Sequence, residues 1–374
     1  ACLQWASQHQ VPVIPYGAGS GVCGAGAGKE GALMLDMKGF YRIGPVDPVQ
    51  RTVRVQAGVL GQHLEDALEK KGFATRHSPS SIWCSTVGGW AASRSAGQFS
   101  SKYGKFEDMV LAMRVVTPTG IFSTGVWAEG EDLGPWFLGT EGALGVITEL
   151  LVRVVPFPQS RWLRGYRFAS VEQAWEAMRA LLQEDLHPAA LRLYDPVDTR
   201  LAGKGTIDHR GQRWWEQLAS RVAEDPSLRS HALSLPLSLP RLLNALADWG
   251  TSDCVMIAGW EGVSETVSAL SEQGHALLIE HGAVDLGSEP GEHWYNARHE
   301  VSYKLAPVFA SGGFADTMEV ASLWSRLPDL YHHVRKAIGR HAVVMAHFSH
   351  AYQEGCSIYF TFAGLGKVEV YDAL

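Results

Sequence analysis

The residues that point most directly to chemistry form the stretch PYGAGSGVCGAGAG at residues 15–28, which follows a short apolar run. Glycine leaves the main-chain N–H groups bare, and successive bare N–H groups can converge on an anion in a nest. A diphosphate fits such a nest. The stretch therefore predicts that backbone amides bind a phosphorylated ligand.

Two other interpretations apply to this stretch. Gly19, Gly21 and Gly24 match GxGxxG, and Asp36 follows a strand as the ribose-binding acid of a dinucleotide fold does. That fold requires a helix directly after the glycines, and residues 24–31, GAGAGKEG, cannot form one. A flexible linker stays open as the structural alternative.

Two further segments have the same sparse side chains. Residues 78–97, SPSSIWCSTVGGWAASRSAG, combine hydroxyl groups with paired glycines that allow main chain to approach a flat ring or a phosphate. Residues 137–149, FLGTEGALGVITE, repeat the pattern around Glu141. Each alone is typical of a tight turn, but three in one domain favour a nucleotide site.

Composition limits the class of protein. The 374 residues suffice for two or three domains, and 46% hydrophobic with 19% charged residues predict a soluble globular protein, which we expect in the cytoplasm. With 32 basic and 39 acidic residues, the net charge of −7 gives no footprint for nucleic acid. Five scattered cysteines without a CxxC pair argue against a disulfide framework or a zinc site.

The elements that must position these residues change in character after Pro158. The first part is glycine-rich, with predicted strands at residues 11–14, 32–37, 52–55 and 145–158, a helix at 61–71 and a hairpin at 109–124. The second part predicts strands at 161–168, 189–195, 254–260 and 356–364 and helices at 264–281 and 323–338, with a further helix that begins at a capping box of Ser170 and Gln173. We expect an α+β sheet with helices packed on one face. The chain starts inside an apparent helix, so we also expect that its outer parts are missing.

The motifs PYGAGSG, SSIWCSTVGGWAASRSAG, YGKFEDMV, VVTPTG and GTEGALGVITE occur in this order. The chain thereby resembles FAD-binding flavoproteins of the vanillyl-alcohol oxidase type (PCMH-type), and is most similar to the alkyldihydroxyacetonephosphate synthase and D-lactate/glycolate dehydrogenase groups. The resemblance implies a two-domain α+β flavoprotein. Residues 1–158 would be the FAD-binding domain without its N-terminal part, and residues 159–374 a ferredoxin-like substrate (cap) domain without its C-terminal part.

The resemblance also assigns residues to non-covalent FAD. The first segment would cradle the pyrophosphate, the second would line the flavin, and the third would close over the adenine and ribitol side. The residues concerned are Pro15, Tyr16, Gly17, Ala18, Gly19, Ser20 and Gly21 in the first segment; Ser80, Ser81, Ile82, Ser85, Thr86, Gly88, Gly89, Ser93, Arg94, Ser95 and Ala96 in the second; and Gly139, Thr140, Glu141, Gly142, Gly145, Val146 and Ile147 in the third.

In the second domain, HPAALRLYD resembles a segment with a substrate-binding arginine, Arg192, and GCSIYFTFAG one with an acid/base tyrosine, Tyr359. A guanidinium grips a carboxylate or phosphate through paired hydrogen bonds, whereas the alternative role is a surface salt bridge. Tyr359 should project opposite to Ile358 and Phe360, and it needs a nearby cation to act as a base. The pattern alone favours a half-buried core tyrosine. Lys304 stands where the related enzymes usually have an arginine.

His347 and His350 are candidates for a base or a substrate hydrogen-bond donor. We expect no metal there, because in an extended segment residues three apart face opposite sides and no GDGN motif follows.

The resemblance implies an enzyme, for which we expect FAD-linked oxidation of a small 2-hydroxy acid of the D-lactate or glycolate type by hydride transfer to flavin N5. The alternative is a synthase-like enzyme of ether-lipid synthesis that uses FAD without net redox change, on acyl-dihydroxyacetone phosphate. A non-catalytic flavin-binding fragment is a third interpretation. A peripheral membrane or electron-acceptor contact and a homodimer stay open.

Overall fold

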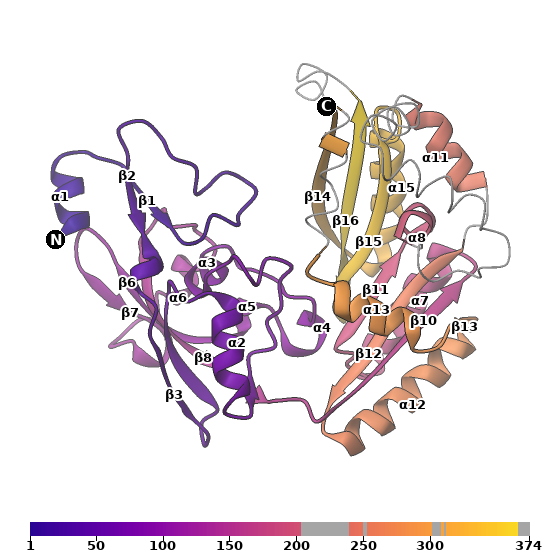
Figure 1. Cartoon of the computed structure of the whole chain (residues 1–374), viewed down its shortest axis with the longest axis horizontal. Coiled ribbons are helices and arrows are strands. Elements are labelled where there is room, and N and C mark those ends of the chain that lie inside the picture. The colour runs from indigo at the N-terminus through magenta and orange to yellow at the C-terminus, as the bar shows by residue number, and fades with distance from the viewer. Residues whose placement is uncertain (203–238, 250–252, 301–307, 310–311, 366–374) are drawn as a thin grey trace, which may run out of the picture. The chain divides into compact units, whose positions relative to one another are not determined.

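The computed structural model describes residues 1–202, 239–249, 253–300, 308–309 and 312–365. The chain divides into two compact units, Ala1–Pro158 and Gln159–Leu374 (Figure 1). Each unit has its own large cluster of buried apolar side chains.

The first unit is built around an antiparallel sheet of five strands in the order β3-β4-β8-β6-β7. Buried Val53 and Val55 alternate with exposed Arg54, as a strand with one covered face requires. The strands of this sheet are β3 (Ile43–Asp47), β4 (Thr52–Gln56), β6 (Val110–Val116), β7 (Ile121–Ser123) and β8 (Val146–Arg153). Strands β5 (Phe73–Ala74) and β9 (Val155–Pro156) form a separate antiparallel pair. The helices of this unit are α1 (Cys2–Gln8), η1 (Met37–Gly39), α2 (Gly61–Glu69), α3 (Val87–Ala92), α4 (Ser100–Tyr103), α5 (Phe106–Met109), η2 (Gly125–Trp127) and α6 (Gly134–Phe137).

Strands β1 (Val13–Tyr16) and β2 (Leu33–Asp36) pair in parallel, and the glycine-rich stretch joins them without a helix. This confirms the predicted strand, loop and strand. The Asp36 carboxylate accepts from the Lys38 N–H at 3.0 Å and so begins η1. The structure therefore excludes a dinucleotide-binding fold here, because no helix follows the glycines and Asp36 caps η1.

The second unit contains one antiparallel sheet of seven strands in the order β13-β10-β12-β11-β15-β16-β14. Its strands are β10 (Ser160–Phe168), β11 (Ala190–Tyr194), β12 (Cys254–Gly262), β13 (Val284–Asp285), β14 (Gly313–Leu323), β15 (Val343–Ala351) and β16 (Gly355–Leu365). Its described helices are α7 (Val171–Gln183), α8 (Pro196–Ala202), α11 (Pro240–Trp249), α12 (Ser264–Glu280), α13 (Glu289–Ala297), η4 (Trp324–Arg326) and α15 (Leu327–Ile338). In the described part of the chain, no helix has both the length and the apolar character that crossing a membrane requires.

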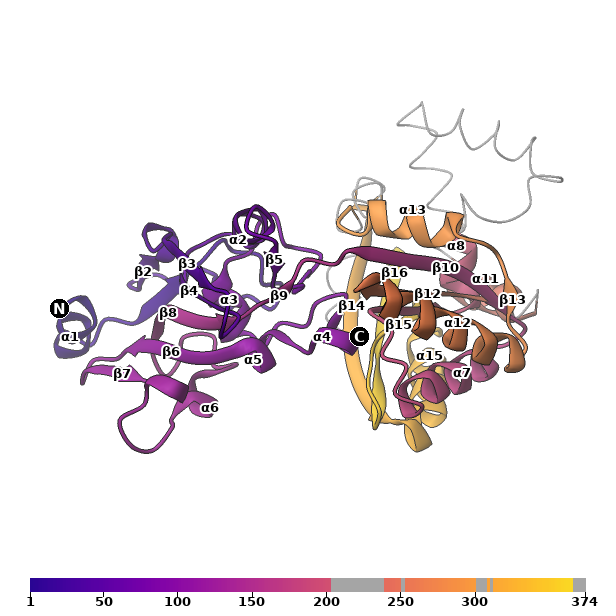
Figure 2. The same ribbon diagram turned by 90° about the horizontal axis from the view of Figure 1, so that it is seen from below.

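The two faces of this sheet differ. Helices α7, α12 and α15 cover one face, where Phe348, Ile358 and Phe360 are fully buried in the large core (Figure 2). Helices α8, α11 and α13 lie against the other face. There the contacts include Val197 of α8 against Val343 and Met345 of β15. Side chains that alternate with the core residues of β11, β15, β16 and β14 therefore share a second, more polar face.

Several predicted boundaries differ from the structure. The helix predicted at 323–338 begins at Leu327, because β14 extends to Leu323. Helices α11 and α13 lie in segments that the sequence pattern left irregular. The capping box before α7 is only half formed: the Ser170 hydroxyl accepts from the Gln173 N–H at 3.2 Å, but the Gln173 side chain accepts from Ala169 N–H.

Two neighbouring positions on β16 allow a test of this division of faces. Phe360→Ala should lower the free energy of unfolding by about 3–5 kcal/mol, because it empties a fully buried ring site. Tyr359→Phe, the matched control, should cost about 0.5–1.5 kcal/mol, since it removes one hydrogen bond to Thr317. Denaturant unfolding followed by tryptophan fluorescence measures both, and equal losses would contradict the assignment of faces.

Candidate active site: a glycine cradle and a polar sheet face

In the first unit, the glycine-rich loop meets the start of α3. A Cβ atom at Gly17 would lie only 2.4 Å from Thr86 Oγ1, so the two segments approach this closely because Gly17 has no side chain. Thr86 is the N-cap of α3, and its Oγ1 accepts from the Gly89 N–H at 3.3 Å. The first two predicted cofactor segments are therefore in contact.

The third segment joins them through Gly142. Its φ of +92° favours glycine, and a Cβ atom there would lie 2.6 Å from Pro15 Cγ. The N–H of Glu141 also donates to Ala92 O at 2.9 Å, which ties the segment to the end of α3. All three segments thus converge, and two glycines allow their close approach.

Most of the predicted hydroxyl groups already have protein partners. Ser85 Oγ accepts from the indole N–H of Trp90 at 2.8 Å, and Ser93 Oγ donates to Gly89 O at 2.9 Å. Gln98 donates to Ser80 Oγ at 3.3 Å. These serines therefore shape the segments through contacts within the protein.

Other predicted cofactor residues contribute differently. The side chains of Ile82, Val146 and Ile147 are buried in the core, so only their main chain is available to a ligand. Arg94 forms an ion pair with Glu107 at 3.2 Å and donates from Nε to Leu138 O at 3.3 Å. Arg94 therefore holds the third segment against the second.

His77 is a site residue that the sequence interpretation missed. It is buried, its Nε2 lies 3.1 Å from Ser95 Oγ, and its ring packs against Trp90 and Phe106 at centroid distances of 4.6 and 5.0 Å. Its position directly before SPSS was the available signal. The imidazole fixes the end of the second segment.

In the second unit, a row of side chains crosses the polar face of the sheet. Tyr194 pairs with His347, His347 with Tyr359, and Tyr359 with Glu319. Directly paired residues of neighbouring antiparallel strands project to the same face. Arg192, two residues before Tyr194, joins the row on that face, and we call these five residues the polar row.

The strongest contact in the polar row joins Arg192 to His347. Arg192 Nη2 lies 2.8 Å from His347 Nε2. A guanidinium can only donate, so His347 Nε2 must accept and the imidazole proton must be on Nδ1. Burial, together with the positive charge of Arg192, lowers the pKa of His347 well below its usual value, in agreement with a neutral ring.

Arg192 keeps unused hydrogen-bonding capacity. Its Nε is buried without a hydrogen-bond partner among the described residues. Its guanidinium also lies over the Tyr194 ring, 5.3 Å from the centroid. A buried donor of this kind is costly unless a ligand satisfies it, and an anion supplies both the acceptor and the opposite charge.

Tyr359 projects away from Ile358 and Phe360, as predicted. Its ring stacks on His347, with centroids 4.9 Å apart and planes 21° apart, and its hydroxyl donates to Thr317 Oγ1 at 3.0 Å. The oxygen of Tyr359 therefore has lone pairs available to a substrate proton. The same imidazole ring contacts Arg192 through its Nε2 atom.

The expectation that His347 and His350 face opposite sides is wrong. The pairing of β15 with β16 shifts between Phe348 and His350, because a bulge there inserts one extra residue. His350 therefore shares the polar face, with Nε2 3.9 Å from Glu319 Oε1. Burial lowers the pKa of His350, while the charge of Glu319 opposes that shift.

Asp198 in α8 is a second residue that the sequence interpretation missed. Its Oδ2 lies 3.4 Å from His347 Nδ1, and burial raises the pKa of Asp198 to about 7 although the charge of Arg192 opposes this. The available signal was a proline-started helix with an acidic residue in its first turn, directly after the Arg192 strand. In the described residues, no group of three or more His, Cys, Asp or Glu side chains could hold a metal ion. Lys304 lies outside the described residues.

Residues 1–125 match the family described as FAD binding domain, and residues 157–372 match the C-terminal domain of FAD linked oxidases. The chain is 30% identical to the alkyldihydroxyacetonephosphate synthase of Trypanosoma brucei brucei over 99% of its own length and 60% of that protein. A solved alkyldihydroxyacetonephosphate synthase superposes with a TM-score of 0.79 at 27% identity, covering 100% of this chain and 66% of that one. The glycolate oxidase subunit GlcD of Bacillus subtilis is 34% identical, but over 50% of this chain and 41% of that protein.

The chain thus spans 58–63% of the length of the three synthases that it matches along almost its entire sequence.

The glycine cradle makes a testable prediction. Gly17→Ala should weaken FAD binding about 10- to 100-fold, because the added methyl group forces the loop away from Thr86. The matched control is Gly28→Ala, where a Cβ atom would meet nothing within 4 Å. Fluorescence titration with FAD measures both, after circular dichroism has shown equal folding. Equal affinities would contradict the cradle.

Proposed function

Since the chain belongs to the FAD-linked oxidases, we propose that it is an enzyme of the alkyldihydroxyacetonephosphate synthase type, acting on a phosphorylated dihydroxyacetone that carries an acyl or alkyl chain. The cofactor is FAD. The converging bare segments around Gly17 and Gly142 fit its diphosphate, since they expose main-chain N–H groups and little side chain. When bound, FAD supplies a ring system that can accept an electron pair from the substrate.

The observation that carries the substrate class is the free Nε of Arg192 on the polar row. A phosphate oxygen can accept from this Nε while Nη2 stays bound to His347. The Tyr359 hydroxyl is then the group that takes up or returns a proton at the carbon beside the substrate carbonyl. The side chains of Arg192, Tyr359 and His347 are partly buried.

The support for a synthase over a hydroxy-acid dehydrogenase comes from coverage. Synthases match 96–100% of the chain, including the second unit with Arg192 and Tyr359. The glycolate and D-lactate enzymes match 50–53% of it. The predicted oxidation of a 2-hydroxy acid therefore has weaker support than its stated alternative.

One experiment separates the two reactions. The purified FAD-loaded protein is mixed without oxygen with D-lactate, with glycolate or with acyl-dihydroxyacetone phosphate plus a long-chain alcohol. We expect consumption of the phosphorylated substrate without lasting bleaching of the flavin absorbance. Stoichiometric bleaching by a hydroxy acid, with the phosphorylated substrate untouched, would overturn the synthase assignment.

Variants of the two central residues test their roles in the same assay. Arg192→Met should lower kcat/KM about 100-fold or more while FAD stays bound, because the phosphate loses a charged partner.

Tyr359→Phe should lower kcat by about 10²- to 10⁴-fold with little change in substrate affinity, because it removes the proton-transferring group. Unchanged kcat/KM in either variant would remove that residue from the active site.

A further inference from the structure

Three side chains from three elements form a line on the second unit: Asp198 of α8, His347 of β15 and Arg192 of β11. The two contacts are His347 Nδ1 to Asp198 Oδ2 at 3.4 Å and Arg192 Nη2 to His347 Nε2 at 2.8 Å. Each imidazole nitrogen thus has one partner, and the ring lies between a carboxyl group and a guanidinium. Its stacking on Tyr359 fixes the plane of the ring as well.

The contacts along this line run in one direction: Arg192 donates to His347 Nε2, and His347 Nδ1 faces the Asp198 carboxyl group. An acceptor on the Asp198 side favours the tautomer with the proton on Nδ1, and this tautomer leaves the Nε2 lone pair for Arg192. If the imidazole were protonated, Nε2 could not accept and would face the guanidinium as a second cation. The contact with Arg192 therefore exists only while His347 is neutral.

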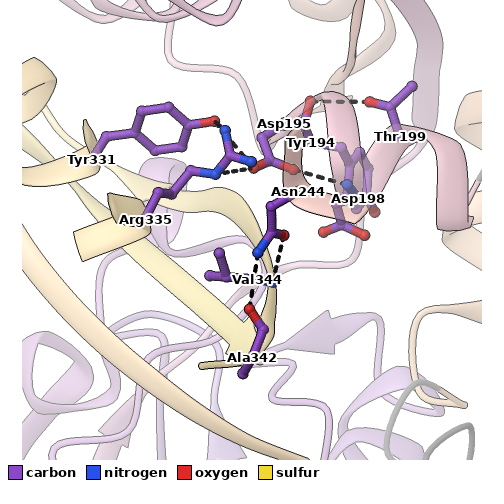
Figure 3. A network of polar contacts seen from close by, with 9 residues as sticks. All are labelled: Tyr194, Asp195, Asp198, Thr199, Asn244, Tyr331, Arg335, Ala342 and Val344. Atoms are coloured by element: carbon purple, nitrogen blue, oxygen red, sulfur yellow. Dashed lines mark hydrogen bonds and ion pairs between the residues drawn. The ribbon is translucent and has the colours of Figure 1, made fainter. Parts of the chain in front are cut away.

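A second set of contacts fixes Asp198 independently of any substrate. Asp195, at the end of β11, points to the face covered by α7, α12 and α15. There its Oδ2 accepts from the Tyr331 hydroxyl at 3.1 Å and lies 3.6 Å from Arg335 Nε (Figure 3). Its Oδ1 accepts from the Asp198 N–H at 2.8 Å. The first turn of α8 is thus attached to α15 through one carboxylate.

The other side of the same turn is attached as well. Thr199 Oγ1 donates to Tyr194 O and accepts from the Val255 N–H, each at 3.1 Å. Asn244 of α11 binds the start of β15, donating to Ala342 O at 2.9 Å and accepting from Val344 N–H at 3.2 Å (Figure 3). Polar contacts therefore hold α8 to β11 and β12, and α11 to β15.

We infer that Asp198 and His347 are positioning residues for the anion-binding arginine: the Asp198 carboxyl group fixes the His347 tautomer, and the imidazole holds Arg192 with its free Nε turned toward the ligand. This inference rests on the proposed function, since it assigns the anion to Arg192. A neutral imidazole orients the guanidinium without cancelling its charge, as a carboxylate in direct contact would do.

The arrangement also makes anion affinity depend on pH. The titratable or charged described groups around Asp198 are His347 on β15, Arg192 and Tyr194 on β11, and the buried Asp195–Arg335 pair behind α8. Burial raises the pKa of Asp198 to about 7. Below this pH the carboxyl group is neutral and the charge of Arg192 is available to an anion; above it, the Asp198 negative charge opposes anion binding.

The test uses inorganic sulfate, whose charge is constant near neutrality, and the FAD-loaded full chain. Sulfate affinity is measured by titration calorimetry between about pH 6 and 8, across the pKa of Asp198. In the unsubstituted protein, affinity should fall as pH rises through about 7. In Asp198→Asn it should stay at the low-pH level, because the amide cannot ionise. A parallel pH dependence in both proteins would overturn the assignment of Asp198.

Two substitutions separate the functions of the His347 ring. His347→Phe keeps a ring to stack on Tyr359 but removes the acceptor for Arg192, so sulfate affinity should fall about 10-fold. His347→Gln restores an acceptor without the ring and should recover most of the affinity. Equal affinities for Phe and Gln would overturn the positioning role.

Arg192→Met serves as the reference variant. If it leaves sulfate affinity unchanged, the anion is not bound at Arg192 and the proposed function loses its basis. If it abolishes sulfate binding while His347→Phe does not weaken it, the anion site stands and the positioning inference alone is wrong. A circular dichroism spectrum equal to that of the unsubstituted protein shows that the second unit is folded in each variant.

Discussion

The arrangement of the second unit depends on one partly buried cation, Arg192, whose Nε is buried and whose direct partner is a neutral imidazole. Burying an unpaired charge is costly, and a carboxylate in contact would be the usual compensation. Here the Asp198 carboxyl group does not contact Arg192 directly, because the His347 ring lies between the two side chains. The guanidinium is therefore held in place with its charge largely uncompensated. A site of this kind is suited to an anion that binds and leaves, and less suited to stabilising the fold.

The first unit shows the opposite arrangement, because glycines without side chains allow its three segments to converge. Gly17 against Thr86 and Gly142 against Pro15 bring three segments together at distances that a methyl group would prevent. Serine hydroxyl groups such as that of Ser85 hold the segments in shape. In the proposed function, backbone amides bind the diphosphate of FAD, and a side chain of the second unit binds the phosphate of the substrate.

The sequence was sufficient for features set by local pattern. Alternation along β16 placed Tyr359 opposite Phe360, and glycine spacing predicted the strand-loop-strand structure around residues 15–28. It was insufficient where one inserted residue changes a face, as at the bulge that brings His350 onto the polar face. It also missed Asp198, because only the antiparallel pairing of β11 with β15 brings α8 beside His347. Long-range pairing of this kind leaves no local pattern.

The tautomer and charge of His347 test the central claim most directly. Histidine-labelled, FAD-loaded protein can be examined by ¹⁵N NMR from about pH 6 to 8, with His347→Phe used to assign the signals. We predict a neutral ring with its proton on Nδ1 throughout this range, since Nε2 accepts from Arg192 and the pKa of His347 lies well below its usual value. An imidazolium near pH 6, or a proton on Nε2, would contradict the account.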